Sequence, residues 1–186
     1  MFGDMSFDFP TQKYQRASVR LKEIIEEVKL ADELGMDIFA IGEHHREDYA
    51  VAAPEILLAA AATVTKNIKL SSGVNVISST DPVKLFQDFT TIDLMSDGRA
   101  EIMAGRGSFI ESFPVFGYNL DNYNELFTEK LDLLLQLRAS DNLTWKGEFR
   151  APINNLTLYP HPEREIPISI AVGGTPASIH RAATLG

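Results

Sequence analysis

The sequence predicts an α/β fold in which parallel β-strands are joined by helical crossovers. Short apolar segments alternate along the chain with longer segments of helical period, and this alternation is typical of successive βα units. The apolar segments are continuous rather than alternating, as expected for parallel strands covered on both faces. The 186 residues contain no repeat and no flexible linker, so we expect one domain that covers residues 1–186.

Five helices are predicted from apolar periodicity and end signals. In the first, Leu21, Ile24 and Val28 recur on one face, and Gly35 is a natural stop. Pro54 suits the first turn of the second helix, and Asp81-Pro82 provides an N-cap and a first-turn proline for the third. The expected ranges are about 18–34, 54–65, 82–95 and 122–137, with a last helix that begins at Pro176.

The expected strands cover residues 37–42, 68–77, 99–104 and 166–172, and Phe2-Gly3-Asp4 has the character of the tail of a first strand. Residues 139–165 form an excursion in which 145–149 are expected to make a small hairpin. We therefore expect about five strands, whereas a closed (β/α)8 barrel has eight strands and usually about 250 residues.

Polar or glycine-rich groups follow four of these strands: Glu43-His44-His45, Ser78-Ser79, Gly105-Arg106-Gly107 and Gly173-Gly174-Thr175. In a parallel barrel these strand ends face one mouth, where active sites lie. In a doubly wound open sheet they gather along a crevice instead. The pattern alone does not separate the two folds.

The histidine pair is the sharpest of these groups. Because neighbouring strand residues point to opposite sides, we expect at most one of the two histidines to face the mouth directly. A histidine there can serve as a general acid or base near neutral pH. The alternative is a hydrogen-bonded packing histidine. A metal site is poorly supported, because no HExxH or comparable ligand spacing occurs.

Two further groups favour an anion. Arg106 lies between two glycines, and a guanidinium is well suited to a phosphate, although a loop arginine paired with Glu101 or Glu111 is the alternative. Thr175 can cap the last helix, whose free N–H groups and dipole favour negative charge, although an ordinary capped helix start explains the same residues. Neither a Rossmann fingerprint nor a P-loop occurs.

Composition excludes several classes of partner. The formal net charge of −9 argues against nucleic acid and an anionic membrane surface. The longest apolar stretch, residues 56–64, is too short to span a bilayer, and no signal peptide is readable. The absence of cysteine excludes a disulfide framework and a thiolate nucleophile, and it fits a cytoplasmic location.

Taken together and in this order, five segments resemble the bacterial-luciferase-like flavin monooxygenases. The resemblance covers nearly the whole chain and implies a TIM (β/α)8 barrel, present as an incomplete barrel of about five β/α units. The segments are residues 40–45, 54–59, 91–99, 105–107 and 171–176.

The resemblance also implies roles for individual residues. His44 matches the family histidine near the reactive edge of the flavin, so with strand alternation the resemblance implies that His44, rather than His45, points into the mouth. Arg106 matches the arginine that holds the flavin phosphate. The phosphate-binding turn is matched by Thr175, Ser178 and the Gly174 backbone. Gly105 falls in the cofactor site where a relative carries a cysteine, so no thiol role is expected here.

The implied activity is that of a flavin-dependent oxidoreductase, first of all a monooxygenase. It would use oxygen and reduced FMN, supplied by a separate flavin reductase, on a small organic substrate. One alternative is a reductase on the same fold that transfers hydride with a deazaflavin coenzyme or NAD(P)H. A non-catalytic flavin-binding or vestigial protein and a metal-dependent hydrolase are the others.

The small number of predicted strands leads to an expectation about chain length and association. A five-strand sheet exposes two edges and an apolar inner face. We therefore expect either a fragment of a longer gene product or pairing with another copy, as a homodimer or a larger homo-oligomer. The resemblance suggests the helices at 54–65 and 82–95 for the dimer contact.

Overall fold

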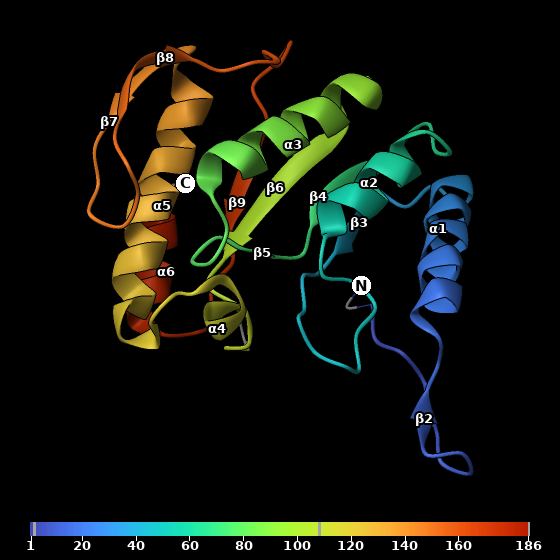
Figure 1. Cartoon of the computed structure of the whole chain (residues 1–186). Helices are drawn as coiled ribbons and strands as arrows, with labels where there is room; N and C mark the ends of the chain where they lie inside the picture. The colour runs from blue at the N-terminus through green and yellow to red at the C-terminus, as the bar shows by residue number, and fades with distance from the viewer. Residues whose placement is uncertain (2, 108, 186) are drawn as a thin grey trace.

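A parallel sheet forms the centre of the computed structural model, which describes residues 1, 3–107 and 109–185. Ala104 of β6 pairs with β5 on one edge and with β9 on the other, and β4 pairs with the first half of β6. β3 pairs with β4 (Figure 1). The strands are β3 (Ile38–Ile41), β4 (Lys69–Ser72), β5 (Asn75–Val76), β6 (Ala100–Gly105) and β9 (Ile168–Ile170).

This strand order decides between the two folds that the sequence leaves open. A doubly wound sheet reverses its strand order at a switch point. Here β3, β4, β6 and β9 lie side by side in the order of the chain, β5 continues β4 along the same edge of β6, and every pairing is parallel. The fold is therefore of the TIM-barrel type, and the described sheet is an open part of such a barrel.

The helices that join the strands pack in a row, as the helical crossovers of a barrel do. α1 contacts α2, α2 contacts α3, and α3 contacts α5 (Figure 1). No helix in the described part of the chain is long and apolar enough to cross a membrane. The helices are α1 (Ala17–Glu33), α2 (Pro54–Ala62), α3 (Pro82–Met95), α4 (Ser112–Phe116), η1 (Leu120–Asn122), α5 (Tyr123–Ala139) and α6 (Pro176–Leu185).

The core lies between these helices and the sheet. Phe89 of α3 and Phe127 of α5 are among the largest fully buried side chains, and they belong to one cluster with Ile41 and Leu70 of the strands. Each such side chain contributes roughly 1.5–3 kcal/mol by leaving water. The predicted apolar helix faces are confirmed: Ile24 and Val28 of α1 are buried, as are Leu126 and Leu134 of α5.

Two predicted elements, a strand and a hairpin, differ from the structure in detail. The single strand expected at 68–77 is split into β4 and β5 by Gly73 and Val74, whose peptide bond is cis. The hairpin expected at 145–149 is wrong, because its strands are β7 (Asn142–Trp145) and β8 (Ile153–Thr157). The Glu129 carboxylate instead accepts hydrogen bonds from the backbone N–H groups of Glu148, at 2.6 Å, and Phe149, at 3.0 Å, which fixes this segment as a connection.

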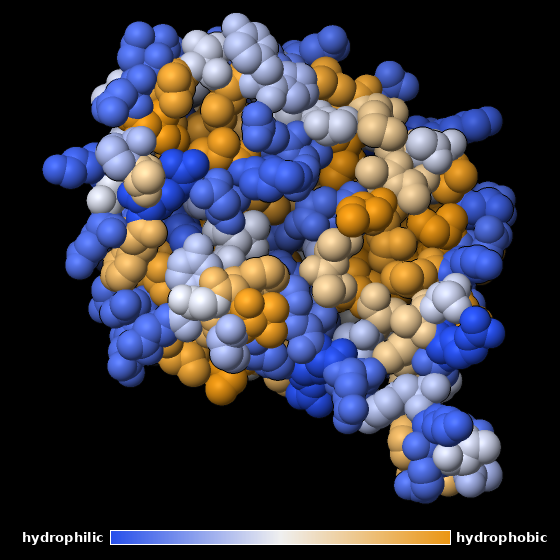
Figure 2. Space-filling view, viewed as in Figure 1, coloured by the Kyte–Doolittle hydropathy of each residue, from blue (hydrophilic) through white to orange (hydrophobic). Residues whose placement is uncertain are grey.

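The expected tail of a first strand is present only in part. Met1 donates to the Ala40 carbonyl and accepts from the Gly42 N–H, which is the bonding of a parallel ladder beside β3. Phe2 lies outside the described residues. Gly3 has φ +70°, which turns the chain, and Asp4 makes an antiparallel bridge to Tyr49 instead. A short hairpin, β1 (Phe7–Asp8) with β2 (Lys13–Tyr14), then projects from the body (Figures 1 and 2).

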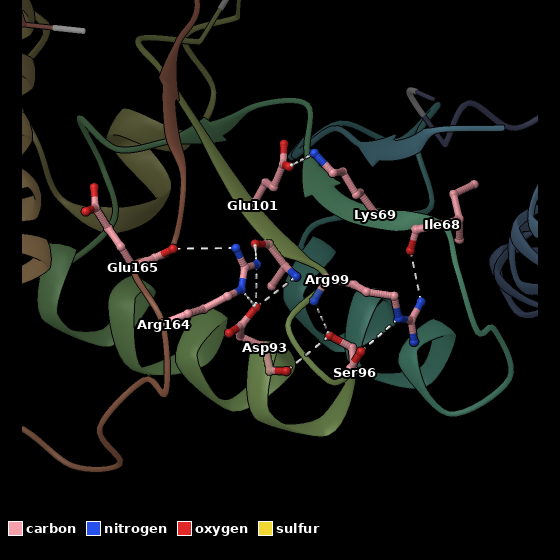
Figure 3. A network of polar contacts seen from close by, with 9 residues as sticks. Ile68, Lys69, Asp93, Ser96, Arg99, Glu101, Arg164 and Glu165 are labelled. Atoms are coloured by element: carbon pink, nitrogen blue, oxygen red, sulfur yellow. Dashed lines mark hydrogen bonds and ion pairs between the residues drawn. The ribbon is translucent and has the colours of Figure 1, made fainter.

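A polar network at the amino-terminal ends of β6 and β9 holds helices to strands (Figure 3). Asp93 of α3 is 2% exposed, and its Oδ1 accepts from Arg164 Nη2 at 2.7 Å and from the Ala100 N–H at 3.1 Å. Arg99 donates to the carbonyl of Ser96 at 2.8 Å and to that of Ile68 at 2.9 Å. This end of a barrel serves stability rather than catalysis.

We predict that Asp93→Ala lowers the free energy of unfolding by about 2 kcal/mol, because it leaves the buried N–H of Ala100 without its acceptor and removes the ion pair with Arg164, whose side chain is 35% exposed. Urea denaturation monitored by circular dichroism measures the loss. Asp88→Ala is the matched control, since Asp88 lies on the same helix and pairs with Lys84 near the surface. It should cost no more than about 0.5 kcal/mol. Equal losses in the two variants would show that the contacts of Asp93 stabilise the fold no more than a surface ion pair does.

Candidate functional site

Two neighbouring cavities lie at the carboxyl ends of the strands. The first has a volume of about 190 Å³, and the second has about 150 Å³. Val74 and Gly107 line both, so the cavities share a wall. The first extends to the histidine pair, and the second extends to Arg106 and Gly173. The strand-end groups after β3, β6 and β9 therefore meet at one mouth, as a parallel barrel requires.

Glu43 organises the histidine end. Its carboxylate is 5% exposed, and Oε2 accepts from the backbone N–H of Val76 at 2.8 Å. Its other oxygen, Oε1, lies 2.8 Å from Nε2 of His45. The backbone N–H of Glu43 donates to the Val74 carbonyl at 3.2 Å. A carboxylate that bonds one ring nitrogen fixes the orientation of the imidazole.

His44 lies in aromatic surroundings. Its ring centroid is 4.2 Å from that of Tyr49 and 5.3 Å from that of Phe109. Its backbone N–H donates to the Val51 carbonyl at 2.9 Å, and this bond links the two ends of the loop that follows β3. Burial lowers the pKa of the His44 imidazole below its ordinary value of 6.5, while the carboxylates of Glu111 and Glu43 act in the opposite direction. Burial thus favours the neutral form of the His44 imidazole, which is the form that can accept a proton.

Both histidines line the first cavity. The expectation that at most one would face the mouth is therefore wrong. The reason is local: β3 ends at Ile41, so residues 43–45 lie beyond the strand, and its alternation of sides no longer applies to them. The expectation of His44 rather than His45 at the mouth is likewise not borne out, because both residues line the cavity.

Arg106 is positioned by the start of α5. Its Nη1 donates to Asn124 Oδ1 at 2.9 Å, and its guanidinium lies 5.2 Å from the centre of the Tyr123 ring. The Tyr123 hydroxyl donates to the Gly107 carbonyl at 2.9 Å, which joins this helix to the loop. Neither acidic partner considered from the sequence holds Arg106: Glu101 pairs with Lys69 at 2.7 Å, and Glu111 lies 3.7 Å from Arg46.

The turn after β9 has the predicted capping geometry. The Ser178 N–H donates to Thr175 Oγ1 at 3.3 Å, and α6 begins at Pro176. Gly174 has φ +81°, and a Cβ built on it would meet nothing within 4 Å, so its backbone faces open space. Gly173 shares the second cavity with Arg106, whereas Thr175 and Ser178 do not line it. The Ser178 hydroxyl donates to the Thr175 carbonyl at 2.8 Å.

The strand-end serines Ser78 and Ser79 do not line either cavity. The Ser78 carbonyl accepts from Nζ of Lys130 at 2.8 Å, and the Ser79 hydroxyl donates to the Val76 carbonyl at 3.2 Å. Lys130 is 2% exposed and lies over the Tyr118 ring, 3.8 Å from its centre. Burial lowers the pKa of Lys130 to about 8. These residues anchor α5 to the loop after β5.

Four acidic or polar residues near the mouth were not singled out from the sequence as site residues. Glu111 and Ser112 line the first cavity from the loop after β6 and the start of α4. Asn75 is fully buried in β5 and donates to Glu55 of α2, and burial raises the pKa of the Glu55 carboxyl. An acidic residue before a short apolar segment carries no distinctive sequence signal. Among the described residues, no cluster of three His, Cys, Asp or Glu side chains could hold a metal ion.

The model of the luciferase-like monooxygenase family matches residues 2–186, and the chain belongs to this family. An F420-dependent glucose-6-phosphate dehydrogenase from Amycolatopsis mediterranei is 27% identical over 164 residues, which covers 82% of this chain and 48% of that protein.

Two solved structures are similar. The monooxygenase RslO1 from Streptomyces bottropensis has a TM-score of 0.86 and 28% identity, over 98% of this chain and 56% of that one. The oxygenating constituent of 3,6-diketocamphane monooxygenase from Pseudomonas putida, in complex with FMN, has a TM-score of 0.73 at 23% identity and shares the fold, over 84% of this chain and 47% of that one. The chain thus spans about half the length of these proteins.

We predict that His44 titrates with a midpoint below 6.5 in an NMR titration of its ring protons, because burial disfavours the imidazolium. In Glu111→Gln the midpoint should fall further, since the Glu111 carboxylate favours the charged ring. A wild-type midpoint at or above 6.5, or a rise in the variant, would contradict the electrostatics of the cavity described above.

Proposed function

We propose that the two adjoining cavities form the cofactor cleft of a flavin-dependent oxidoreductase. One observation carries the proposal: a cleft at the strand ends has a histidine pair at one end and an arginine with an open glycine turn at the other. This polarity suits a ligand with a redox-active ring at one end and a phosphate at the other. The ring would lie beside His44, and the phosphate would lie beside Arg106.

The residues present fit such a cofactor. Arg106 is partly exposed, is directed by Asn124 and Tyr123, and supplies the charge-assisted donors that a phosphate prefers. The backbone of Gly174 and the start of α6 add N–H groups and a positive dipole end, with Thr175 and Ser178 as the capping side chains beside them. At Gly105 a Cβ would lie 2.5 Å from Val74 Cγ2, so this wall stays backbone only, and a thiol there is absent.

The protein contributes binding, orientation and proton handling, while the bound flavin supplies the redox chemistry. Neutral His44 is placed to accept or return a proton at the edge of the cleft. His45 is held by Glu43 and forms the adjacent wall. Val74, Val76 and Phe109 give this end of the cleft an apolar wall beside its polar residues.

Within this class we propose a monooxygenase that uses reduced FMN from a separate flavin reductase. The similarity to a monooxygenase over nearly the whole chain supports it. The alternative is a hydride-transfer reductase that uses a deazaflavin, which the F420-dependent relative supports. A non-catalytic flavin-binding protein is the second alternative. Association of copies through α2 and α3 also stays a proposal; Ile56 of α2 is 71% exposed, and apolar surface gathers around α2 (Figure 2).

We predict that Arg106→Ala weakens FMN binding by about 10- to 100-fold, because a hydrogen bond to a charged group contributes roughly 1.5–3 kcal/mol. Riboflavin, which lacks the phosphate, should bind the variant and the wild type equally. Calorimetric titration measures both affinities. Arg16→Ala, at an exposed arginine before α1, is the matched control. Equal losses for FMN and riboflavin would place the phosphate elsewhere.

We predict oxygen uptake above that of flavin alone when a flavin reductase, NADH and FMN are supplied with a panel of small neutral compounds. His44→Ala should reduce the uptake at least tenfold while leaving FMN binding largely intact, since the phosphate contacts at the other end of the cleft remain. An oxygen electrode measures the rate. Substrate turnover with reduced F420 and without oxygen would favour the reductase instead. FMN binding without turnover of either kind would favour the non-catalytic alternative.

A further inference from the structure

Both residues of the two-residue strand β5 are held by a carboxyl group from outside the sheet. The Asn75 side chain donates from Nδ2 to Oε1 of Glu55, which lies in the first turn of α2. The next residue, Val76, donates its backbone N–H to Glu43 Oε2 at 2.8 Å. Glu43 Oε1 in turn lies 2.8 Å from Nε2 of His45. A continuous series of contacts therefore leads from α2 through β5 to the histidine pair.

Glu55 differs from an ordinary acidic residue in the first turn of a helix. Such a residue commonly lies in solvent and interacts with the positive end of the helix dipole. Glu125, in the first turn of α5, is exposed in this way. Glu55 is partly buried instead, and its side chain bonds a strand residue of the sheet. Its carboxyl group thus links a helix to the sheet close to the candidate site.

The Asn75 side chain depends on this contact. Asn75 is 0% exposed, and its Oδ1 has no hydrogen-bond partner in the part of the chain that the structure describes. The bond to Glu55 is therefore the one hydrogen bond that the described residues provide for this amide. Its loss would leave both ends of a buried amide unpaired, which native proteins rarely tolerate. We expect β5 to shift if Glu55 no longer accepts from Asn75.

Charge places a second constraint on Glu55. Burial raises the pKa of its carboxyl group above the ordinary value of 4.5, and the charges of Glu43 and Asp88 act in the same direction. The hydrogen bond from Asn75 lowers this pKa. Lys84 and Asp88, an ion pair of α3, line the groove between α2 and α3 together with Glu55. Two carboxyl groups that hold one short strand therefore influence each other's charge.

We propose that Glu55 is a positioning residue for the histidine pair. Its carboxyl oxygen holds Asn75 and with it β5, whose Val76 N–H anchors Glu43. Glu55 lines neither of the two cavities, so it acts on the cleft only through Glu43 and His45. The proposal rests on the proposed function for the role of the histidines. The reach of the Glu55 oxygen, rather than its charge, is the property that matters for this role.

Three substitutions of Glu55 separate its reach from its charge. Glu55→Gln keeps an acceptor oxygen at the same reach and removes the charge. Glu55→Asp keeps the charge and withdraws the oxygen, and Glu55→Met removes both. Glu125→Met is the matched control, because Glu125 is an exposed glutamate in the first turn of another helix.

Two NMR signals of the flavin-free chain report the position of Glu43. One is the exchange rate of the Val76 N–H, taken relative to that of the Phe89 N–H in the core so that local opening is separated from global unfolding. The other is the ring Nε2–H proton of His45, which is visible only while its bond to the carboxylate slows exchange with water.

Glu55→Asp and Glu55→Met should raise the relative exchange rate of Val76 roughly tenfold, as the loss of a buried hydrogen bond predicts. Both should also remove the His45 signal. Glu55→Gln and Glu125→Met should keep the signal and the wild-type rate. Wild-type behaviour of Glu55→Met would overturn the proposal. Wild-type behaviour of Glu55→Asp with losses in Glu55→Gln would also overturn it, because charge rather than reach would then be responsible.

A measurement on the wild type decides if the Glu55 variants fail to fold by circular dichroism. In a titration of the carboxyl carbons, Glu55 should have a midpoint above 4.5, because burial raises its pKa. The Asn75 side-chain amide and the Val76 N–H should both shift with this midpoint. The Asn124 side chain, which bonds Arg106, is the reference that should not follow it. A midpoint of Glu55 that is absent from Asn75 or from Val76 would overturn the proposal.

The flavin-free format separates this proposal from the cofactor. A chain that behaves as expected in these measurements but does not bind FMN contradicts only the proposed oxidoreductase. A chain that binds FMN, while Glu55→Met leaves the Val76 and His45 signals unchanged, contradicts only the positioning role of Glu55.

Discussion

The buried carboxylate of Glu43 joins the parts of the candidate site. One oxygen accepts the backbone N–H of Val76 in β5, and the other bonds the ring of His45. The loop after β3 is thereby held to the segment that pairs with β6, and β6 leads into Gly105 and Arg106. Because a buried carboxylate without partners is costly, this loop is restricted to the geometry that satisfies it. The position of both histidines relative to Arg106 depends on this link.

The polar network around Asp93 and the candidate site lie at opposite ends of the strands. Asp93 and Arg99 belong to a segment that resembles the family, yet they lie where β6 begins and bind helix ends and strand backbone. Arg106 lies where β6 ends and lines a cavity. β6 therefore connects the polar network at its start to the cavity at its end. Substitutions at its start should affect stability, and substitutions at its end should affect ligand binding. Family resemblance alone does not separate these roles, whereas the position along a parallel strand does.

Much of the fold could be predicted from local signals. The Asp81-Pro82 start of α3 and the buried faces of α1 and α5 follow from capping and periodicity. The strand order was not readable, because it depends on pairing between distant segments. The candidate site was predictable at Arg106 and at the Thr175 cap, which lie directly after strands. That both His44 and His45 line the cavity was missed, because strand alternation was applied beyond Ile41, where β3 ends. Glu111 and Ser112 were missed because only the fold of the loop after β6 brings them to the cavity.

The central claim is that one cleft holds a flavin with its ring at the histidines and its phosphate at Arg106. A crystal structure of the chain soaked with FMN tests this most directly. The account predicts the isoalloxazine ring beside His44 and the phosphate within hydrogen-bond distance of Arg106 and the Gly174 backbone. An FMN bound with its phosphate at the histidine end, or bound outside the two cavities, would contradict the account.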